Sequence, residues 1–101
     1  METFEKKYNN GSLSILIKDD SIGLTNLNDL NTIVNSELNT DCKEIEIDFV
    51  NVNSINSSGL GILIACYKKV KSVNKDLRLV NLNDKILNVF KITKLDTVFG
   101  L

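Results

Sequence analysis

The spacing of the apolar residues changes from alternating to helical near the middle of this chain, which restricts the folds that the chain can adopt. Between Lys43 and Val50, Ile45, Ile47 and Phe49 alternate with acidic residues, which is the period of a strand with one face in water. From Ser58 to Asn74 the apolar residues recur every three or four positions, as on one face of a helix. They are Leu60, Leu63, Ile64, Tyr67, Val70 and Val73. A strand followed directly by a helix predicts a domain in which both element types pack together.

A β-hairpin of two strands and a helix are expected before this central pair. Strand-like runs at 3–8 and 13–18 flank Asn9-Asn10-Gly11, and an Asn-Gly step between two such runs predicts a β-hairpin. From Thr25 to Asn39 the apolar residues again have helical spacing, which predicts the first helix.

The last third of the chain continues the alternation of element types. A short strand is expected at 77–80, a helix at 83–92 and a final short strand at 98–101. Strands that alternate with helices favour parallel pairing. The sequence therefore predicts one α/β domain over residues 1–101, with an N-terminal β-hairpin and a mixed, mostly parallel sheet on which helices pack.

The charge pattern argues against nucleic acid and membranes as partners. The chain has 12 basic and 13 acidic residues, a formal net charge of -1, and its charges alternate in sign along the sequence without a basic patch. No apolar run approaches the roughly 18 residues of a membrane span, and the N-terminus lacks the apolar core of a signal peptide. We therefore expect a cytoplasmic protein.

The chain offers few ligands for metals or cofactors. It has no histidine, the most common general base and metal ligand. Cys42 and Cys66 are far apart in the sequence, and we expect buried free thiols rather than a disulfide or a metal site. Asp19, Asp20 and Asp48 could form a magnesium cluster, although a solvated turn with a strand-end aspartate is the favoured interpretation. No cofactor is expected.

Ser57 and Ser58, in the segment Ile55-Asn-Ser-Ser-Gly-Leu-Gly61, allow three interpretations. Asn56, Ser57 or Ser58 can cap the helix that follows, but capping does not explain all three residues. A catalytic serine would need an activating base, and the sequence has no histidine and no nucleophile-elbow motif, so only a serine-lysine pair remains. A phosphoacceptor needs no activation by its own protein, because the kinase supplies the base, nucleotide and magnesium.

The segment from Ile45 to Gly61, an apolar strand, a short loop and then Asn-Ser-Ser-Gly-Leu-Gly, resembles the signature of STAS domains, the anti-sigma factor antagonists. The resemblance covers nearly the whole chain, since the element order matches and the ending at 81–101 is similar to the family's ending. It implies a protein that regulates transcription by partner switching and is not an enzyme.

The resemblance also implies which residues act. Ser57, with Ser58 as second choice, would be phosphorylated by a serine protein kinase that is also the anti-sigma factor, and only the unmodified antagonist would bind that partner. A phosphatase that resets the switch is a further partner in this scheme. The implied partner-binding residues are Asn56, Ser57, Ser58, Gly59, Leu60, Gly61 and Lys68.

The sequence departs from the family pattern at two positions. Asn56 replaces the aspartate before the phosphoacceptor, and Gly23 stands where the last acid of a Gly-Glu-Leu-Asp turn aligns. A kinase that recognises these carboxylates could reject the chain. The alternative function is therefore a STAS adaptor subunit of a signalling scaffold or transport complex, in which Ser57 is never phosphorylated.

Overall fold

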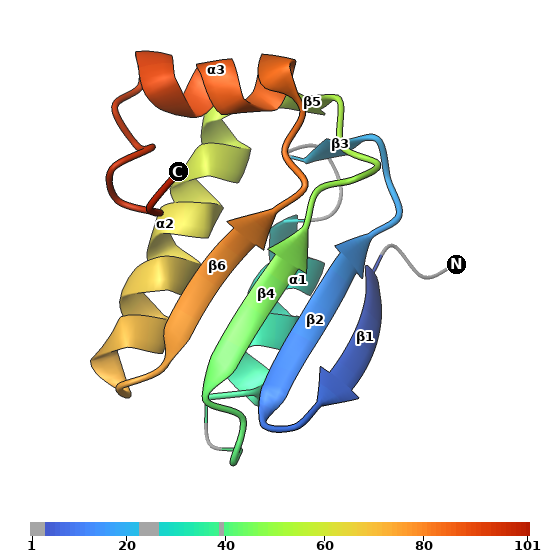
Figure 1. Ribbon diagram of the computed structural model, residues 1–101, viewed down its shortest axis with the longest axis vertical. Helices are drawn as coiled ribbons and strands as arrows, with labels where there is room; N and C mark the ends of the chain where they lie inside the picture. The colour runs from blue at the N-terminus through green and yellow to red at the C-terminus, as the bar shows by residue number, and fades with distance from the viewer. Residues whose placement is uncertain (1–3, 23–26, 39) are drawn as a thin grey trace.

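The computed structural model describes residues 4–22, 27–38 and 40–101. In this part of the chain, a four-stranded sheet has the order β1-β2-β4-β6 (Figure 1). Its strands are β1 (Phe4–Asn9), β2 (Ser12–Ile17), β4 (Glu44–Asp48) and β6 (Asp76–Val80). β1 is antiparallel to β2, and the other two pairs are parallel. The predicted mixed and mostly parallel sheet is confirmed.

The N-terminal hairpin turns at Asn10-Gly11, as predicted. Both residues have positive φ, 47° at Asn10 and 85° at Gly11, which is the backbone of the tight turns that favour this dipeptide. Phe4 then lies opposite Ile17, and Asn9 opposite Ser12. This register places Leu13, Ile15 and Ile17 on one face of β2, where all three are fully buried.

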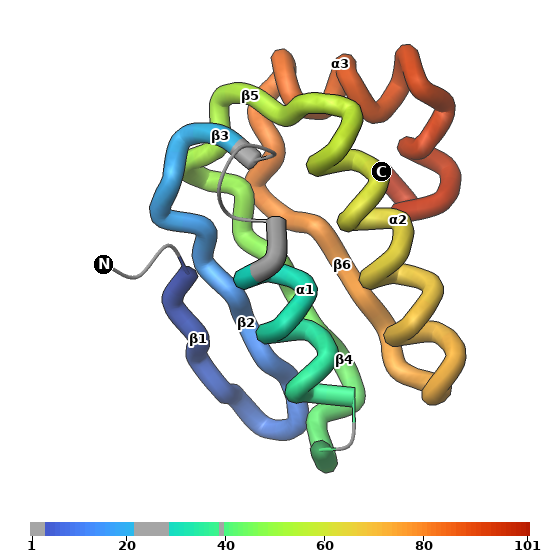
Figure 2. Tube along the Cα trace, turned by 180° about the vertical axis from the view of Figure 1, so that it is seen from behind, coloured from blue at the N-terminus to red at the C-terminus, as the bar shows by residue number. Residues whose placement is uncertain are grey.

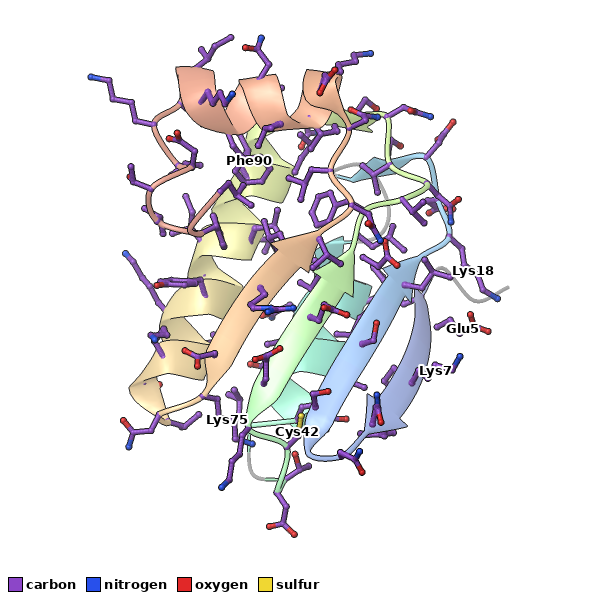
Figure 3. All side chains as sticks on the ribbon, in the orientation of Figure 1. Glu5, Lys7, Lys18, Cys42, Lys75 and Phe90 are labelled. Atoms are coloured by element: carbon purple, nitrogen blue, oxygen red, sulfur yellow. The ribbon has the colours of Figure 1, made fainter. Side chains whose placement is uncertain are left out.

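Two helices cover one face of the sheet. α1 (Leu27–Ser36) and α2 (Ser57–Ser72) lie on the same side (Figure 2), while α3 (Asp84–Ile92) crosses the end where β2, β4 and β6 finish. The core between helices and sheet contains the apolar side of β4, with Ile45, Ile47 and Phe49 fully buried. The other face carries Glu44, Glu46, Asp48 and Arg78, and Figure 3 shows that none of the described helices covers it. No described helix is long and apolar enough to span a bilayer.

The predicted final strand at 98–101 is wrong. α3 ends at Ile92, and Lys94, with φ 61°, reverses the chain so that the N–H groups of Leu95 and Asp96 donate to the carbonyl of Phe90. Residues 96–100 then form turns. The apolar residues here pack by their side chains instead, because the Phe99 ring lies edge-on to Tyr67 and Phe90 at centroid distances of 5.2 and 5.6 Å.

Two strands of two residues each were missed. β3 (Ser21–Ile22) and β5 (Ser54–Ile55) pair in parallel, apart from the main sheet. The other predicted elements are present with ends shifted by a few residues, and the expected positions 3, 25, 26 and 39 lie outside the described residues.

Candidate functional site

The segment Asn56–Gly61 begins α2, and Asn56 is its N-cap. Asn56 has an extended backbone, with φ -100° and ψ 178°. Its side-chain Oδ1 accepts a hydrogen bond from the N–H of Gly59 at 2.8 Å, and its carbonyl accepts one from the N–H of Leu60 at 3.0 Å. One residue therefore caps the helix, and neither serine is needed for that purpose.

Ser57 and Ser58 are both exposed in the first turn of α2. The first N–H groups of a helix have no partners within the helix and give this end a partial positive charge. A phosphate on Ser57 would be placed at the favourable end of the helix dipole. The geometry thus provides an accessible hydroxyl at a position that tolerates an anion.

The next three residues differ in exposure. Gly59 is buried, and Leu60 is part of the hydrophobic core with 9% of its surface exposed. Gly61 is exposed, and a Cβ added there would meet no heavy atom within 4 Å. Of the predicted partner-binding residues, Leu60 anchors the helix to the core, whereas Ser57, Ser58 and Gly61 form an open surface.

Lys68 is the predicted residue farthest along α2. It lies 11 positions after Ser57, about three turns and 16 Å along the same side of the helix. Its neighbours are engaged, since Lys69 donates to Oδ1 of Asn31 at 3.0 Å and Lys71 pairs with Asp76 at 2.9 Å. Within the described residues, Lys68 is exposed and forms no ion pair.

The small β3/β5 pair brings a second loop to this site. The carbonyl of Asp20 accepts hydrogen bonds from the N–H groups of Asn53 and Ser54, at 2.7 and 3.2 Å. The acidic turn Asp19–Asp20 therefore lies against the chain that leads into Ser57. The resemblance implies that an acid of this turn lies close to the phosphoacceptor, but the β3/β5 pairing could not be predicted, because two-residue strands have no measurable period. The aligned position Gly23 lies outside the described residues.

A third contact comes from α3. Nδ2 of its N-cap residue Asn83 donates to the carbonyl of Val52 at 3.1 Å and to Oδ1 of Asn53 at 3.2 Å. Nδ2 of Asn51 donates to the carbonyl of Ile17 at 3.1 Å. The loop before Ser57 is thus held by hydrogen bonds to the end of β2 and to the start of α3.

In the described part of the chain, the cysteines and aspartates do not form a catalytic or metal-binding centre. Cys42 and Cys66 are buried and unpaired, as predicted. Burial raises the pKa of the Cys66 thiol to about 11, so this group is a poor nucleophile. Oδ1 of Asp48 accepts from the Val50 N–H and from Nδ2 of Asn81. The described residues include no group of three or more cysteine, aspartate or glutamate side chains placed to hold a metal ion.

Several curated proteins are similar to part of this chain. The anti-sigma-B factor antagonist of Listeria monocytogenes is 30% identical over 57 residues, which are 56% of this chain and 50% of the relative. The anti-sigma-B factor antagonist of Bacillus subtilis is 29% identical over 58 residues, or 57% of this chain and 53% of that protein. The matched region thus spans about half the length of these relatives.

Solved structures resemble the fold over nearly the full length. The anti-sigma factor antagonist from Mycobacterium paratuberculosis has a TM-score of 0.82 at 21% identity, covering 96% of this chain and 81% of that one. The antagonist SpoIIAA in its unphosphorylated form has a TM-score of 0.75 at 15% identity and covers 97% of each chain. At these identities the likeness concerns the fold.

A match to a protein-family model covers more of the sequence than the curated relatives do. The family described as "STAS domain" matches residues 6–101, from the hairpin through the α2 segment to the C-terminal turns. Together with the sheet order and the capped α2 segment, this match shows that the chain belongs to the STAS domain family.

Proposed function

We propose that this protein is an anti-sigma factor antagonist that works by partner switching in the cytoplasm. In its unmodified form it binds a partner that is both an anti-sigma factor and a serine protein kinase. Phosphorylation of Ser57 releases the partner, and a phosphatase restores the binding form. The protein acts by binding and takes no part in the chemistry except as the substrate of its kinase.

The observation that best supports this proposal is the division of roles at the start of α2. Asn56 caps the helix through Gly59, so within the described residues the exposed Ser57 hydroxyl is not needed for that cap. The names of the curated relatives, anti-sigma-B factor antagonists, agree with a binding partner of the anti-sigma class.

The same geometry suggests how a phosphate would act. It adds a charge of about -1.5 to -2 at neutral pH, beside a strip of α2 that carries the exposed residues Ser57, Gly61 and Lys68. The strip has little side-chain bulk at its N-terminal end, so a partner backbone can approach closely. A dianion at this point would have to lose its hydration at the interface, which opposes binding.

The Asp19–Asp20 turn supplies negative charge near Ser57, where this chain has Asn56 in place of the family's aspartate. Because Asp20 binds Asn53 and Ser54 through its carbonyl, its carboxylate is carried on the loop next to the serine segment. A kinase that requires negative charge beside its phosphoacceptor would find it in this turn. The uncharged Asn56 and the adjacent acidic turn are therefore compatible with phosphorylation.

The proposal can be tested on protein purified from its own host, from growing and from stressed cells. Intact-mass measurement with peptide mapping should show a form heavier by about 80 Da, the mass of one phosphoryl group, located at Ser57. Ser57→Ala should abolish this form, and Ser58→Ala should retain it. A chain that stays unmodified in every condition would support the adaptor function instead.

Two substitutions of Ser57 separate the effect of negative charge on partner binding from the effect of side-chain size. Once the partner has been isolated, Ser57→Asp should weaken its binding at least tenfold, whereas the uncharged Ser57→Asn should bind nearly as well as wild type. Equal affinities for wild type and Ser57→Asp would contradict the switch.

A further inference from the structure

The charged residues of the edge strand β1 are complementary to those of a second β1 strand placed antiparallel to it. β1 is the first strand of the sheet, and among the described residues it pairs only with β2. Its outer backbone groups are therefore available to another strand. Proteins protect such edges with lysines, prolines or bulges, because an unprotected edge is a template for pairing. The sequence Phe4-Glu-Lys-Lys-Tyr-Asn9 has no proline, and its lysines are accompanied by an acid.

Side chains alternate between the two faces of β1. Glu5 lies opposite Leu16 and Lys7 opposite Ser14, so both are on the sheet face that none of the described helices covers. Figure 3 shows Glu5 and Lys7 extending from the β1 margin of the sheet. Both are exposed, and neither forms an ion pair within the described residues. An acid and a base thus stand two positions apart on one open face.

We propose that β1 pairs in an antiparallel manner with β1 of a second copy of this chain, with Lys6 at the two-fold axis. In this register Glu5 of each copy lies opposite Lys7 of the other. The product is one continuous sheet of eight strands with the helices of both copies on the same face.

The charges on β1 favour this register over the registers with the two-fold axis at Glu5 or at Lys7. Opposite residues in a sheet must point to the same face, so the axis must pass through a single residue. An axis at Glu5 would place the two copies of Glu5 against each other, and an axis at Lys7 would do the same with lysines. Like charges directly opposite destabilise a strand pair, whereas opposite charges stabilise it. Only the axis at Lys6 gives two favourable pairs on the open face.

The helix-side residues of β1 are compatible with this arrangement. Phe4 would lie opposite Tyr8 of the second copy, an aromatic cross-strand pair, and Tyr8 has 60% of its surface exposed. The two copies of Lys6 would face each other, but each already has Oε1 of the buried Glu37 at 3.8 Å from its Nζ. The glutamate partly compensates the lysine charge on each side of the axis.

The dimer would leave both proposed switch sites free. β1 is separated from β6, the strand next to α2, by two strands, about 14 Å at usual strand spacing. Five paired residues extend over only about 17 Å, so the interface is small and belongs to the weak class. We expect a Kd on the order of 100 μM.

Sedimentation velocity at protein concentrations from about 10 μM to 1 mM tests the proposal. Wild type should shift from monomer to dimer over this range. Lys7→Glu and Glu5→Lys should each weaken dimerisation at least fivefold, and the double variant Glu5→Lys with Lys7→Glu should restore it. Lys85→Glu, an exposed charge reversal on α3, is the control with the same charge change as Lys7→Glu. A monomer at all concentrations, or a dimer that is insensitive to these charges, would overturn the proposal.

Disulfide trapping tests the register independently. Opposite Cα atoms of an antiparallel pair are about 4.5 to 5.5 Å apart, within the range that a disulfide can bridge. Lys6→Cys should therefore give a cross-linked dimer under mild oxidation. Asn9→Cys should not form this cross-link, because in the proposed register the two copies of residue 9 are six positions apart along the strands. Cross-linking of Asn9→Cys in place of Lys6→Cys would show that the strands pair differently or not at all.

Discussion

The amide of Asn83 joins the start of α3 to the loop that precedes the proposed phosphoacceptor. Its Oδ1 accepts from the Ile86 N–H at 2.9 Å, while its Nδ2 donates to the Val52 carbonyl at 3.1 Å. The acceptor caps a helix and the donor fixes a loop 31 positions earlier in the chain. One side chain thus couples the orientation of α3 to the position of Ser57.

These two roles can be separated by substitution. Asn83→Ser should retain the cap and lose the contact with Val52, whereas Asn83→Ala should lose both and destabilise the fold by about 1 to 2 kcal/mol. Urea unfolding gives the stabilities. Amide hydrogen exchange at 52–57 should increase in both variants, and unchanged exchange in Asn83→Ser would show that the loop is held without this contact.

Gly61 should reveal a conflict between stability and binding. Because a Cβ at this position meets nothing within 4 Å, Gly61→Ala should stabilise α2 by roughly 0.5 to 1 kcal/mol, as expected for glycine in a helix interior. A larger residue, as in Gly61→Leu, should fold normally and bind the anti-sigma partner less well. Thermal unfolding and partner titration measure the two effects, and full binding by Gly61→Leu would remove Gly61 from the interface.

Cys66 should make stability depend on alkaline pH. Burial raises the pKa of its thiol to about 11, compared with about 8.5 in an unfolded chain. Between these values the unfolded state binds fewer protons than the native state, so the free energy of unfolding falls as pH rises from about 8.5 to 11. This contribution is fully present below pH 8.5. The difference between wild type and Cys66→Ala across this range isolates it from the titration of lysines and tyrosines.

The aromatic contact at the C-terminus should contribute substantially to stability. Phe99 is buried against Tyr67 and Phe90, and Phe99→Ala should destabilise the protein by about 3 kcal/mol. Val98→Ala, a change at an exposed neighbour, should cost much less. Equal stabilities of the two variants would show that the C-terminal turns do not close the core.

The elements that could be predicted from the sequence are those with enough residues to show a period. β4 and α2 have clear periods, and Asn10-Gly11 identified the hairpin. Val98 and Phe99 looked like strand residues because apolar character does not reveal where backbone hydrogen bonds go. Here the N–H groups of Phe99 and Leu101 bind the carbonyls of Leu95 and Asp96, so a local turn replaces the strand.

The candidate site was predicted in part. The motif identified Asn56 to Gly61, and the cap could be assigned to one of three residues but not to a particular one. The contacts from Asp20 and Asn83 join segments about 30 positions apart in the sequence and use polar residues without a repeating pattern. Such contacts follow from the parallel topology of the sheet, which brings the ends of β2, β4 and β6 together.

The buried Lys75 joins the chain after α2 to the segment that follows α1. Its Nζ donates to the carbonyls of Glu37 and Thr40, each at 2.7 Å, and it lies at the end of the sheet opposite α3 (Figure 3). The carbonyls that follow α1 therefore gain this partner only when a residue about 35 positions later has arrived. During synthesis on the ribosome, Glu37 and Thr40 emerge before Lys75, so these two carbonyls gain their hydrogen bonds to Lys75 only after the α2–β6 connection has emerged.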